Sequence, residues 1–219
     1  MSSVLITGAS GLVGRQVLAL LLASPQITRI IVAARKAPAS HPKITCYIDA
    51  RLQSALEQVD IPVDTVFCCL GTTQKEAGSK AAFRAVDYDM VVATGEAGKR
   101  LGATHMLVVS AMGADAASWF FYNRVKGEAE QALISQHWSR LTIARPSMLL
   151  GHRDRPRLLE RLSSPLFQCL PGRWKAIQSA DVARAMVYYA SRSGTVPVEI
   201  KMSANIRQDA ALLKDPAGN

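Results

Sequence analysis

Short apolar runs rich in β-branched residues recur along the chain, and stretches with a helical spacing of apolar positions lie between them. Most of the apolar runs are continuous, which is typical of strands covered on both faces of a sheet. The pattern predicts strands at Val4–Thr7, Ile30–Ala33, Ile44–Ile48, Thr65–Leu70, His105–Ser110, Leu141–Ala144 and Val196–Met202. It predicts helices at Leu12–Ala23, Leu52–Val59, Tyr88–Leu101, Tyr122–Gln136 and Val182–Ser191.

This alternation of strand and helix indicates the fold class. Strands joined through helices form a parallel sheet with right-handed crossovers. We therefore expect an α/β protein, with one Rossmann-type, doubly wound parallel sheet over residues 1–205 and a small substrate or lid segment at 151–175 within it. Asp181 is expected to cap the helix that follows it, and residues 206–219 are expected to form a flexible tail.

Composition narrows the class of protein. The chain has 219 residues, of which 49% are hydrophobic and 20% charged, as in a soluble globular protein with one sizeable core. No stretch reaches the roughly 20 apolar residues that a membrane span needs, and the start of the chain does not look like a signal peptide. We expect no membrane association and a cytoplasmic location. The four cysteines lack metal-ligand spacing, which predicts reduced thiols and no metal site.

The charge is the unusual bulk property. With 26 Lys+Arg against 17 Asp+Glu the net charge is +9, and the basic residues are dense in the segment 151–175. This segment either contacts an anionic small-molecule substrate or faces solvent. The absence of a recognition motif argues against nucleic acid as a partner. The helices expected at Tyr88–Leu101 and Tyr122–Gln136 could pair two subunits into a homodimer.

A glycine-rich turn follows the first expected strand. Gly8, Gly11 and Gly14 stand between that strand and an amphipathic helix, the context of a dinucleotide-binding fingerprint. Gly8 suits the tight turn, Gly11 a close approach of the backbone to a pyrophosphate, and Gly14 the packing of helix on strand. The first helix would direct its free N–H groups at the phosphates.

The residues after the second strand bear on the choice of cofactor. An NAD site typically has an acidic residue there, whereas this chain has Arg35 and Lys36. An arginine can hold a 2′-phosphate in a bidentate pair, so NADP is favoured over NAD. The alternative is that Arg35 is a solvated loop residue. Asp49 could accept a hydrogen bond from the adenine amino group or cap the next helix, while Leu70 and Gly71 would lie beside the ribose.

Ser110, Tyr122 and Lys126 are the candidate catalytic residues. Ser110 ends a strand on the cofactor side of the sheet, and Tyr122 and Lys126 lie one turn apart on the following helix. An ammonium near a phenol favours phenolate, so the tyrosine becomes a usable acid or base. Ser110 could hold the substrate oxygen. The alternative is an ordinary surface tyrosine and lysine.

Together, the Thr7–Gly14 turn, the Tyr122–Lys126 pair and Ala144-Arg145-Pro146-Ser147 resemble the short-chain dehydrogenase/reductase superfamily. The stretches 67–73 and 109–115 resemble its atypical, small members related to the HIV Tat-interacting oxidoreductase. The resemblance implies bound NADP(H), Tyr122 as proton donor or acceptor, and Lys126 holding the nicotinamide ribose and tuning the tyrosine. The further cofactor contacts that it implies are Ser10, Gly11, Leu12, Val13, Arg35, Leu70 and Gly71, and we expect Gly8, Gly14, Asp49 and Pro146 to complete the cofactor-binding residues.

The chain departs from the wider superfamily in two places. The asparagine-alanine-glycine signature after the fourth strand is replaced by Cys69-Leu70-Gly71. Ser110 is followed by Ala111, so the catalytic serine has one candidate and its register is open. The resulting hypothesis is an NADP-dependent oxidoreductase. The alternatives are a sensor that binds NADPH without turnover and a sugar-nucleotide epimerase, which the 73 residues after Pro146 disfavour on size.

Overall fold

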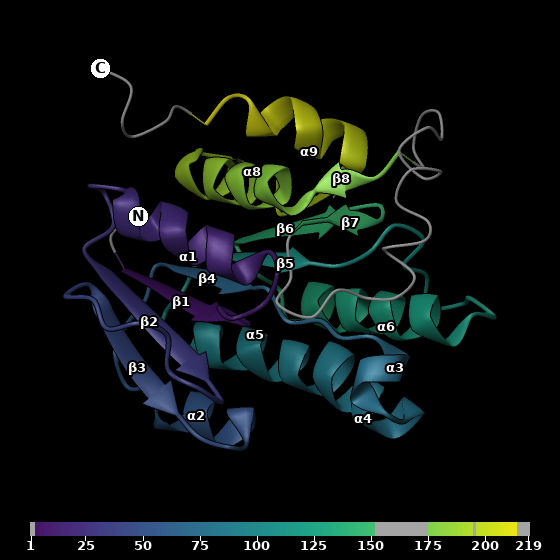
Figure 1. Cartoon of the computed structure of the whole chain (residues 1–219), viewed down its shortest axis with the longest axis horizontal. Helices are drawn as coiled ribbons and strands as arrows, with labels where there is room; N and C mark the ends of the chain where they lie inside the picture. Colours follow the sequence, from purple (N-terminus) through teal and green to yellow (C-terminus); the bar gives the residue numbers. More distant parts are fainter. Residues whose placement is uncertain (1–2, 152–174, 195, 214–219) are drawn as a thin grey trace.

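The computed structural model describes residues 3–151, 175–194 and 196–213 (Figure 1). These residues form a seven-stranded sheet in the order β3-β2-β1-β4-β5-β6-β9, with every neighbouring pair parallel. The strands are β1 (Ser3–Thr7), β2 (Arg29–Ala34), β3 (Ile44–Ile48), β4 (Thr65–Cys68), β5 (His105–Val109), β6 (Arg140–Arg145) and β9 (Val198–Met202). A separate parallel pair joins β7 (Leu149–Leu150) to β8 (Ile177–Gln178).

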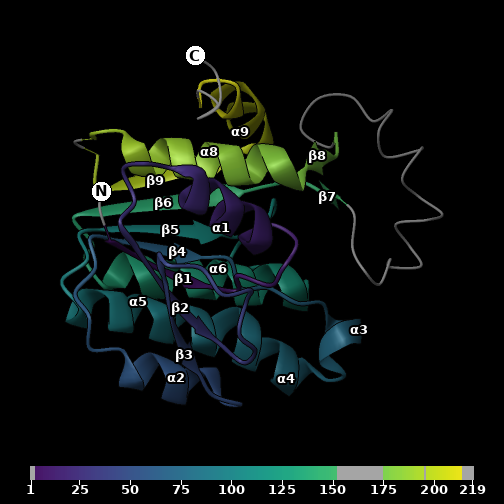
Figure 2. The same ribbon diagram turned by 60° about the vertical axis from the view of Figure 1, so that its left-hand side comes forward.

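Helices cover both faces of this sheet, as Figure 2 shows from the side. One layer holds α1 (Gly14–Ala23), α8 (Ser179–Ser191) and α9 (Ser203–Ala210). The other holds α2 (Leu52–Gln58), α5 (Met90–Arg100) and α6 (Phe121–Ser135), together with α3 (Gln74–Ala77), α4 (Lys80–Arg84) and a π-helical turn, η1 (Ala85–Asp89). This three-layer arrangement confirms the expected doubly wound Rossmann fold.

Burial on two faces explains why the strands read as continuous apolar runs. Successive side chains of a strand point to opposite faces. Val4 and Ile6 of β1 pack with α1 and α8, while Leu5 between them packs with α2 and α5. All three are fully buried. The centre of β1 is therefore apolar toward both faces of the sheet.

The sheet order defines where a ligand can bind. The chain runs outward from β1 through β2 to β3, then crosses back to place β4 on the other side of β1. At such a reversal, connections leave the carboxyl ends of neighbouring strands in opposite directions and open a crevice. The glycine-rich turn after β1 lies at this crevice. No helix among the described residues is long and apolar enough to cross a bilayer.

Two local predictions are wrong. Asp181 does not cap α8, because the helix begins at Ser179 directly after β8 and places Asp181 in its first turn. There its carboxylate favourably faces the positive end of the helix. Residues 206–210 are not a flexible tail but the second half of α9, anchored by the buried side chains of Ile206 and Ala210. Residues 214–219 of the expected tail, and 152–174 of the expected lid, lie outside the described part of the chain.

Candidate functional site

The turn after β1 is built as the glycine pattern predicts. Gly8 has a φ of +71°, and a Cβ there would lie 2.5 Å from the carbonyl carbon of Cys69. A Cβ at Gly14 would lie 2.0 Å from the oxygen of Gly8, so α1 packs directly on the turn. Side chains are therefore excluded at both positions, by backbone strain and close packing at Gly8 and by close packing at Gly14.

Gly11 is tied into the same turn. Its N–H donates to the Gly8 oxygen at 2.9 Å, and a Cβ at Gly11 would lie 3.2 Å from that oxygen. Leu12 and Val13 are buried, so only their backbone can face a ligand, whereas Ser10 is exposed. The first turn of α1 contains no acidic residue and Val13 offers no side-chain cap. Its N–H groups are thus suited to an anion.

A cavity of about 530 Å³ opens beside this turn. It lies past the carboxyl ends of β1 and β2, and Gly8, Ala9, Ser10, Ala33, Ala34, Arg35, Lys36, Ala50, Leu52 and Leu70 line it. Most of the lining residues are small, and two of them, Arg35 and Lys36, are cations.

Asp49 does not cap α2, and its expected contact with the adenine amino group stays a prediction. Its Oδ1 accepts a hydrogen bond from the backbone N–H of Arg51 at 2.8 Å, just before α2. The helix itself is preceded by Arg51 as the capping position, without a side-chain cap. Asp49 is also absent from the residues that line the cavity. The carboxylate thus serves a local turn in this structure.

Tyr122 and Lys126 lie one turn apart on α6. The Tyr122 side chain is partly exposed and packs on the buried Phe83, with ring centroids 5.5 Å apart. The Lys126 ammonium is buried and lies 2.7 Å from Oδ1 of Asp87. Although burial lowers the pKa of Lys126, the Asp87 carboxylate and the nearby Tyr122 oxygen outweigh it, and the pKa is raised. Lys126 is therefore charged at neutral pH.

Asp87 comes from the π-helical turn η1 and is fully buried. Its Oδ2 accepts a hydrogen bond from the backbone N–H of Thr72 at 2.9 Å. A Cβ at Gly71 would lie 3.7 Å from both Asp87 Oδ1 and Lys126 Nζ. Gly71, Asp87 and Lys126 thus form one compact group where β4 ends. No periodic pattern indicates Asp87, because it precedes the helix expected at Tyr88–Leu101.

Ser110 faces the protein interior. Its hydroxyl donates to the Glu130 carboxylate, which also forms a bidentate pair with the guanidinium of Arg145, with Nε 3.0 and 3.1 Å from its two oxygens. Glu130 raises the pKa of Arg145 through this hydrogen bond, so the pair is charged. A carboxylate only accepts, which makes Ser110 the donor. Because its single proton is used, Ser110 can offer a substrate only an acceptor oxygen.

Glu130 was not among the expected site residues, although its position in the sequence indicates that it belongs with them. It follows Tyr122 and Lys126 at the next i+4 position on the same face of α6.

Pro146 connects the segments that follow β5 and β6. Its carbonyl oxygen accepts a hydrogen bond from the N–H of Met112 at 2.9 Å. Neither Glu130 nor Pro146 lines the cavity beside the glycine turn.

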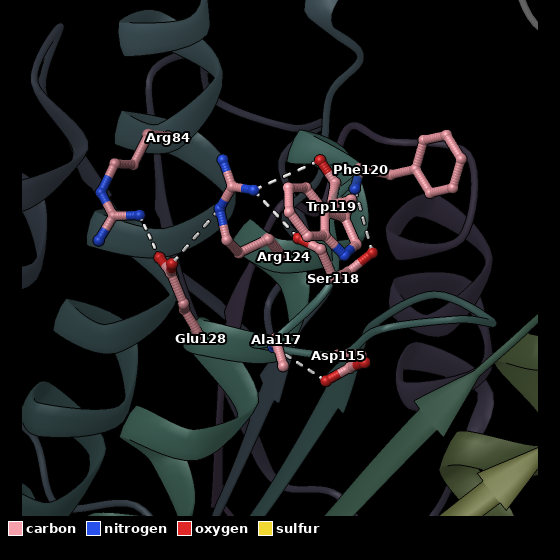
Figure 3. Close-up of polar contacts among 8 residues, drawn as sticks. All are labelled: Arg84, Asp115, Ala117, Ser118, Trp119, Phe120, Arg124 and Glu128. Carbon is pink, nitrogen blue, oxygen red and sulfur yellow. Dashed lines mark hydrogen bonds and ion pairs between the residues drawn. The ribbon is translucent and has the colours of Figure 1, made fainter.

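The loop before α6 is held by its own hydrogen bonds (Figure 3). The N–H of Ala117 donates to the Asp115 carboxylate at 2.9 Å, and the guanidinium of Arg124 donates to the carbonyl of Ser118 at 3.0 Å. Trp119 and Phe120, at the end of the loop, are 96% and 76% exposed. Two aromatic rings therefore stand in solvent two to three residues before Tyr122.

The fold and this site define a dinucleotide-binding Rossmann protein. The NAD(P)H-binding family model matches residues 8–192, and the chain belongs to that family. Protein HTATIP2 of Rattus norvegicus is 32% identical over 212 residues, which cover 90% of this chain and 85% of the relative. The mitochondrial protein FMP52 of Coccidioides immitis is 31% identical, over 90% of this chain and 89% of the relative.

Solved structures show the same fold at lower identity. A short chain dehydrogenase family protein from Francisella tularensis superposes with a TM-score of 0.68 at 14% identity, covering 94% of this chain and 98% of its own. The Bordetella bronchiseptica enzyme WbmH, in complex with NAD⁺, superposes with a TM-score of 0.71 at 17% identity, covering 93% and 76%. These structures show the fold alone, whereas the family model and the HTATIP2 and FMP52 relatives confirm the expected resemblance to a group of NAD(P)-binding proteins.

Proposed function

We propose that this protein is an NADP-dependent oxidoreductase of the short-chain dehydrogenase type. The observation that carries the proposal is the position of Tyr122 beside the buried ammonium of Lys126, at the carboxyl edge of a sheet whose glycine turn can hold a dinucleotide. A protein that only binds the cofactor has no need of a phenol placed beside a buried cation.

The preference for NADP rests on Arg35 and Lys36. Both line the cavity beside the glycine turn, at the place where an acidic residue would favour NAD. The N-terminal end of α1, which has no acidic residue in its first turn, would receive the pyrophosphate. Gly71 and Lys126 would lie beside the nicotinamide ribose, with the ammonium donating to its hydroxyls.

The bound nicotinamide supplies or receives a hydride. The protein contributes the proton, because the Tyr122 hydroxyl would give it to the carbonyl oxygen in reduction or take it from the alcohol in oxidation. Ser110 was expected to hold a substrate carbonyl or hydroxyl, and of these two roles its hydrogen bond to Glu130 favours the second. With its proton directed at Glu130 it cannot donate to a carbonyl oxygen, and its remaining role is to accept from a substrate hydroxyl or to anchor α6.

The other expectations stay predictions. We infer a small-molecule substrate, anionic if the arginines of 151–175 contact it, and a cytoplasmic location. The fungal FMP52 relatives are named as mitochondrial proteins. Membrane or nucleic-acid partners are not part of the proposal, and a homodimer through α5 and α6 is a further prediction.

The substitution Tyr122→Phe tests the catalytic assignment. It removes only the proton-exchanging hydroxyl, so turnover of an accepted carbonyl compound should fall by about 10²- to 10⁴-fold while NADPH affinity stays within about two-fold. Turnover is followed through NADPH absorbance on a panel of aldehydes and ketones. Tyr188→Phe, which removes a phenol from α8 on the opposite face of the sheet, is the matched control and should be fully active.

Two outcomes would contradict the proposal. Unchanged activity in Tyr122→Phe would show that another group moves the proton. Tight NADPH binding with no turnover across a broad panel would favour the sensor, in which the dinucleotide controls contact with another protein.

A further inference from the structure

The strand β9 forms one end of the seven-stranded sheet, and β3 forms the other. The inner edge of β9 pairs with β6, and within the described part of the chain no strand pairs with its outer edge. Figure 2 shows β9 beside β6 and next to α8. An unpaired edge presents a row of N–H and C=O groups that can pair with a strand of another molecule. The outer edge of β9 is therefore a candidate interaction surface.

The backbone of β9 has a defined inner and outer side. The N–H of Leu141 in β6 donates to the carbonyl oxygen of Pro197, directly before β9, at 2.7 Å. Backbone groups of successive residues point to alternate sides of a strand. The outward groups therefore belong to three residues, Val198, Ile200 and Met202. Because Pro197 faces β6, its missing N–H does not interrupt the outer edge.

Three apolar side chains of β9 lie on the sheet face of α5 and α6. Val198 packs against the core cluster that includes Leu141 and Ile143 on this face. Ile200 and Met202 share the face, because side chains alternate along a strand. The Ile200 side chain is 44% exposed. A second strand along this edge would remove that apolar surface from water, which favours association.

The two charged side chains of β9 lie on the other face. The Lys201 ammonium is 5.2 Å from the ring centroid of Tyr189 in α8 and 3.5 Å from the Glu199 carboxylate. Both side chains are partly exposed, at 20% for Lys201 and 26% for Glu199. One carboxylate and one ammonium are thus placed symmetrically about Ile200.

This order of charges is complementary to itself in an antiparallel pair. About a two-fold axis at Ile200, Glu199 stands opposite Lys201 of the partner subunit, and Lys201 stands opposite Glu199 of the partner subunit. Opposite charges directly across a strand pair stabilise it, and like charges destabilise it. The outward N–H and C=O of Ile200 would exchange two hydrogen bonds with Ile200 of the partner subunit. The charges and the backbone therefore select the same register.

The strand at the other end of the sheet lacks this property. β3 has no charged side chain between Ile44 and Ile48, so no charge pairing would select one register for a second copy. The hydroxyl of Tyr47 donates to Asp60 of the same chain at 2.7 Å. Of the two edge strands, β9 is the one whose side chains match a second copy of themselves.

We propose that β9 is the contact between two copies of this chain, which pair antiparallel about a two-fold axis at Ile200 and join their sheets into one continuous sheet. Such a contact is isologous, because each copy uses the same surface. It differs from a homodimer through α5 and α6, and it does not depend on the proposed activity.

Two single substitutions test the order of charges. Glu199→Lys leaves β9 with two ammonium groups, and Lys201→Glu leaves it with two carboxylates, so each variant would place like charges opposite each other. The Kd of the homodimer, measured by sedimentation velocity over a series of protein concentrations, should rise by at least about ten-fold in each variant.

Mixing the two variants is the decisive step. In a heterodimer of Glu199→Lys with Lys201→Glu, opposite charges again face each other across the strand pair. The Kd of the heterodimer should therefore return to about that of the wild-type homodimer. A fold damaged in one subunit would not recover on mixing, so this result reports the contact between β9 strands.

A second substitution keeps the test decisive if a charge variant does not fold. Ile200→Lys places two like charges at the axis and should also raise the Kd by at least about ten-fold. Ile48→Lys in β3 and Ile134→Lys in α6 are matched controls, because both isoleucines are 40% exposed. Both controls should dimerise with the wild-type Kd, and circular dichroism checks that each variant is folded.

Three results would overturn the inference. The first is a wild-type chain that stays monomeric over the whole concentration series. The second is a mixture of folded Glu199→Lys and Lys201→Glu proteins that forms no heterodimer. The third is a dimer that Ile134→Lys disrupts and Ile200→Lys does not, which would place the contact on α6.

Discussion

Single residues contribute to this site in two ways. The glycines lack side chains that would fill the turn, and the charged residues supply its electrostatic field. Gly8 and Gly14 leave the space in which β1, α1 and the segment after β4 meet. Arg35 and Lys36 supply the positive charge beside that space, and the Asp87–Lys126 pair supplies a fixed ammonium farther along the same edge. A phosphate group and a ribose would thus be recognised by different residues, which can be tested separately.

Arg35→Ala should weaken NADPH binding selectively. Loss of a charge-assisted, bidentate phosphate contact costs about 1.5 to 3 kcal/mol, which is roughly a ten-fold to hundred-fold rise in Kd. The Kd for NADH, which has no 2′-phosphate, should hardly change. Fluorescence or calorimetric titration with each cofactor measures both.

Arg29→Ala removes the same charge at the opposite end of β2 and is the control, with wild-type affinity expected for both cofactors. Equal affinity of the wild-type protein for NADPH and NADH would refute the role of Arg35.

At the scale of elements, α6 connects the chemistry to the core. It carries Tyr122, Lys126 and Glu130 at successive i+4 positions, and Glu130 links the helix to β5 through Ser110 and to β6 through Arg145. Gly127 brings the other side of the helix against the preceding loop. A Cβ there would lie 2.2 Å from the backbone nitrogen of Ala116.

Gly127→Ala should therefore destabilise the protein, although alanine is the better helix former by about 1 kcal/mol. The clash is with backbone atoms, which cannot rotate away, and forced overpacking typically costs about 1 to 3 kcal/mol. Denaturant unfolding measures the change.

Gln131→Ala, at an exposed position of the same helix, should leave stability within about 0.5 kcal/mol of wild type. A Gly127→Ala protein as stable as wild type would mean that α6 is not held tightly against its loop.

The elements that the sequence predicted were those with clear periodicity. Continuous apolar runs and the glycine turn were enough for all seven strands of the main sheet and for α1, because buried strands and a dinucleotide turn have strong local signals. The region 74–87 was missed, because α3 and α4 are short and η1 does not keep the 3.6-residue period. The helix α9 was missed because its eight residues are mostly polar.

The sequence predicted only those residues of the candidate site that belong to a local pattern. Tyr122, Lys126 and Arg35 lie in motifs with fixed spacing, so the sequence shows them. Asp87 and Arg145 contact α6 only after the chain has folded, over separations that no local pattern reports. The direction of the Ser110 hydroxyl depends on that folded network.

At the scale of the whole molecule, the cofactor edge of the sheet is opposite the end at which β5 and β6 begin. His105 at that opposite end is buried, with Nε2 3.0 Å from the hydroxyl of Thr142. Burial, together with the nearby Arg140, lowers the pKa of His105 to about 3. The imidazole is therefore neutral in the folded protein well below its usual titration range.

This histidine should make stability decrease in acid. Below about pH 6.5 His105 binds a proton in the unfolded chain, whereas in the folded protein it stays neutral down to about pH 3. The free energy of unfolding therefore decreases as pH falls through that range. Denaturant unfolding at pH 7 and pH 4.5 should give a loss of about 2 kcal/mol that is absent in His105→Gln. His137→Asn, at an exposed histidine with a φ of +53°, should keep the full loss. An equal pH dependence in wild type and His105→Gln would contradict this assignment.

In the proposed function, hydride passes between NADPH and a carbonyl compound. The most direct measurement incubates the wild-type chain and a carbonyl panel with NADPH that carries two deuterium atoms at C4 of the nicotinamide, and determines the mass of each alcohol formed. We expect an alcohol product that contains one deuterium. In Tyr122→Phe its rate of formation should be about 10²- to 10⁴-fold lower. NADPH bound with high affinity, but no deuterated product from any carbonyl compound in the panel, would contradict the proposed function.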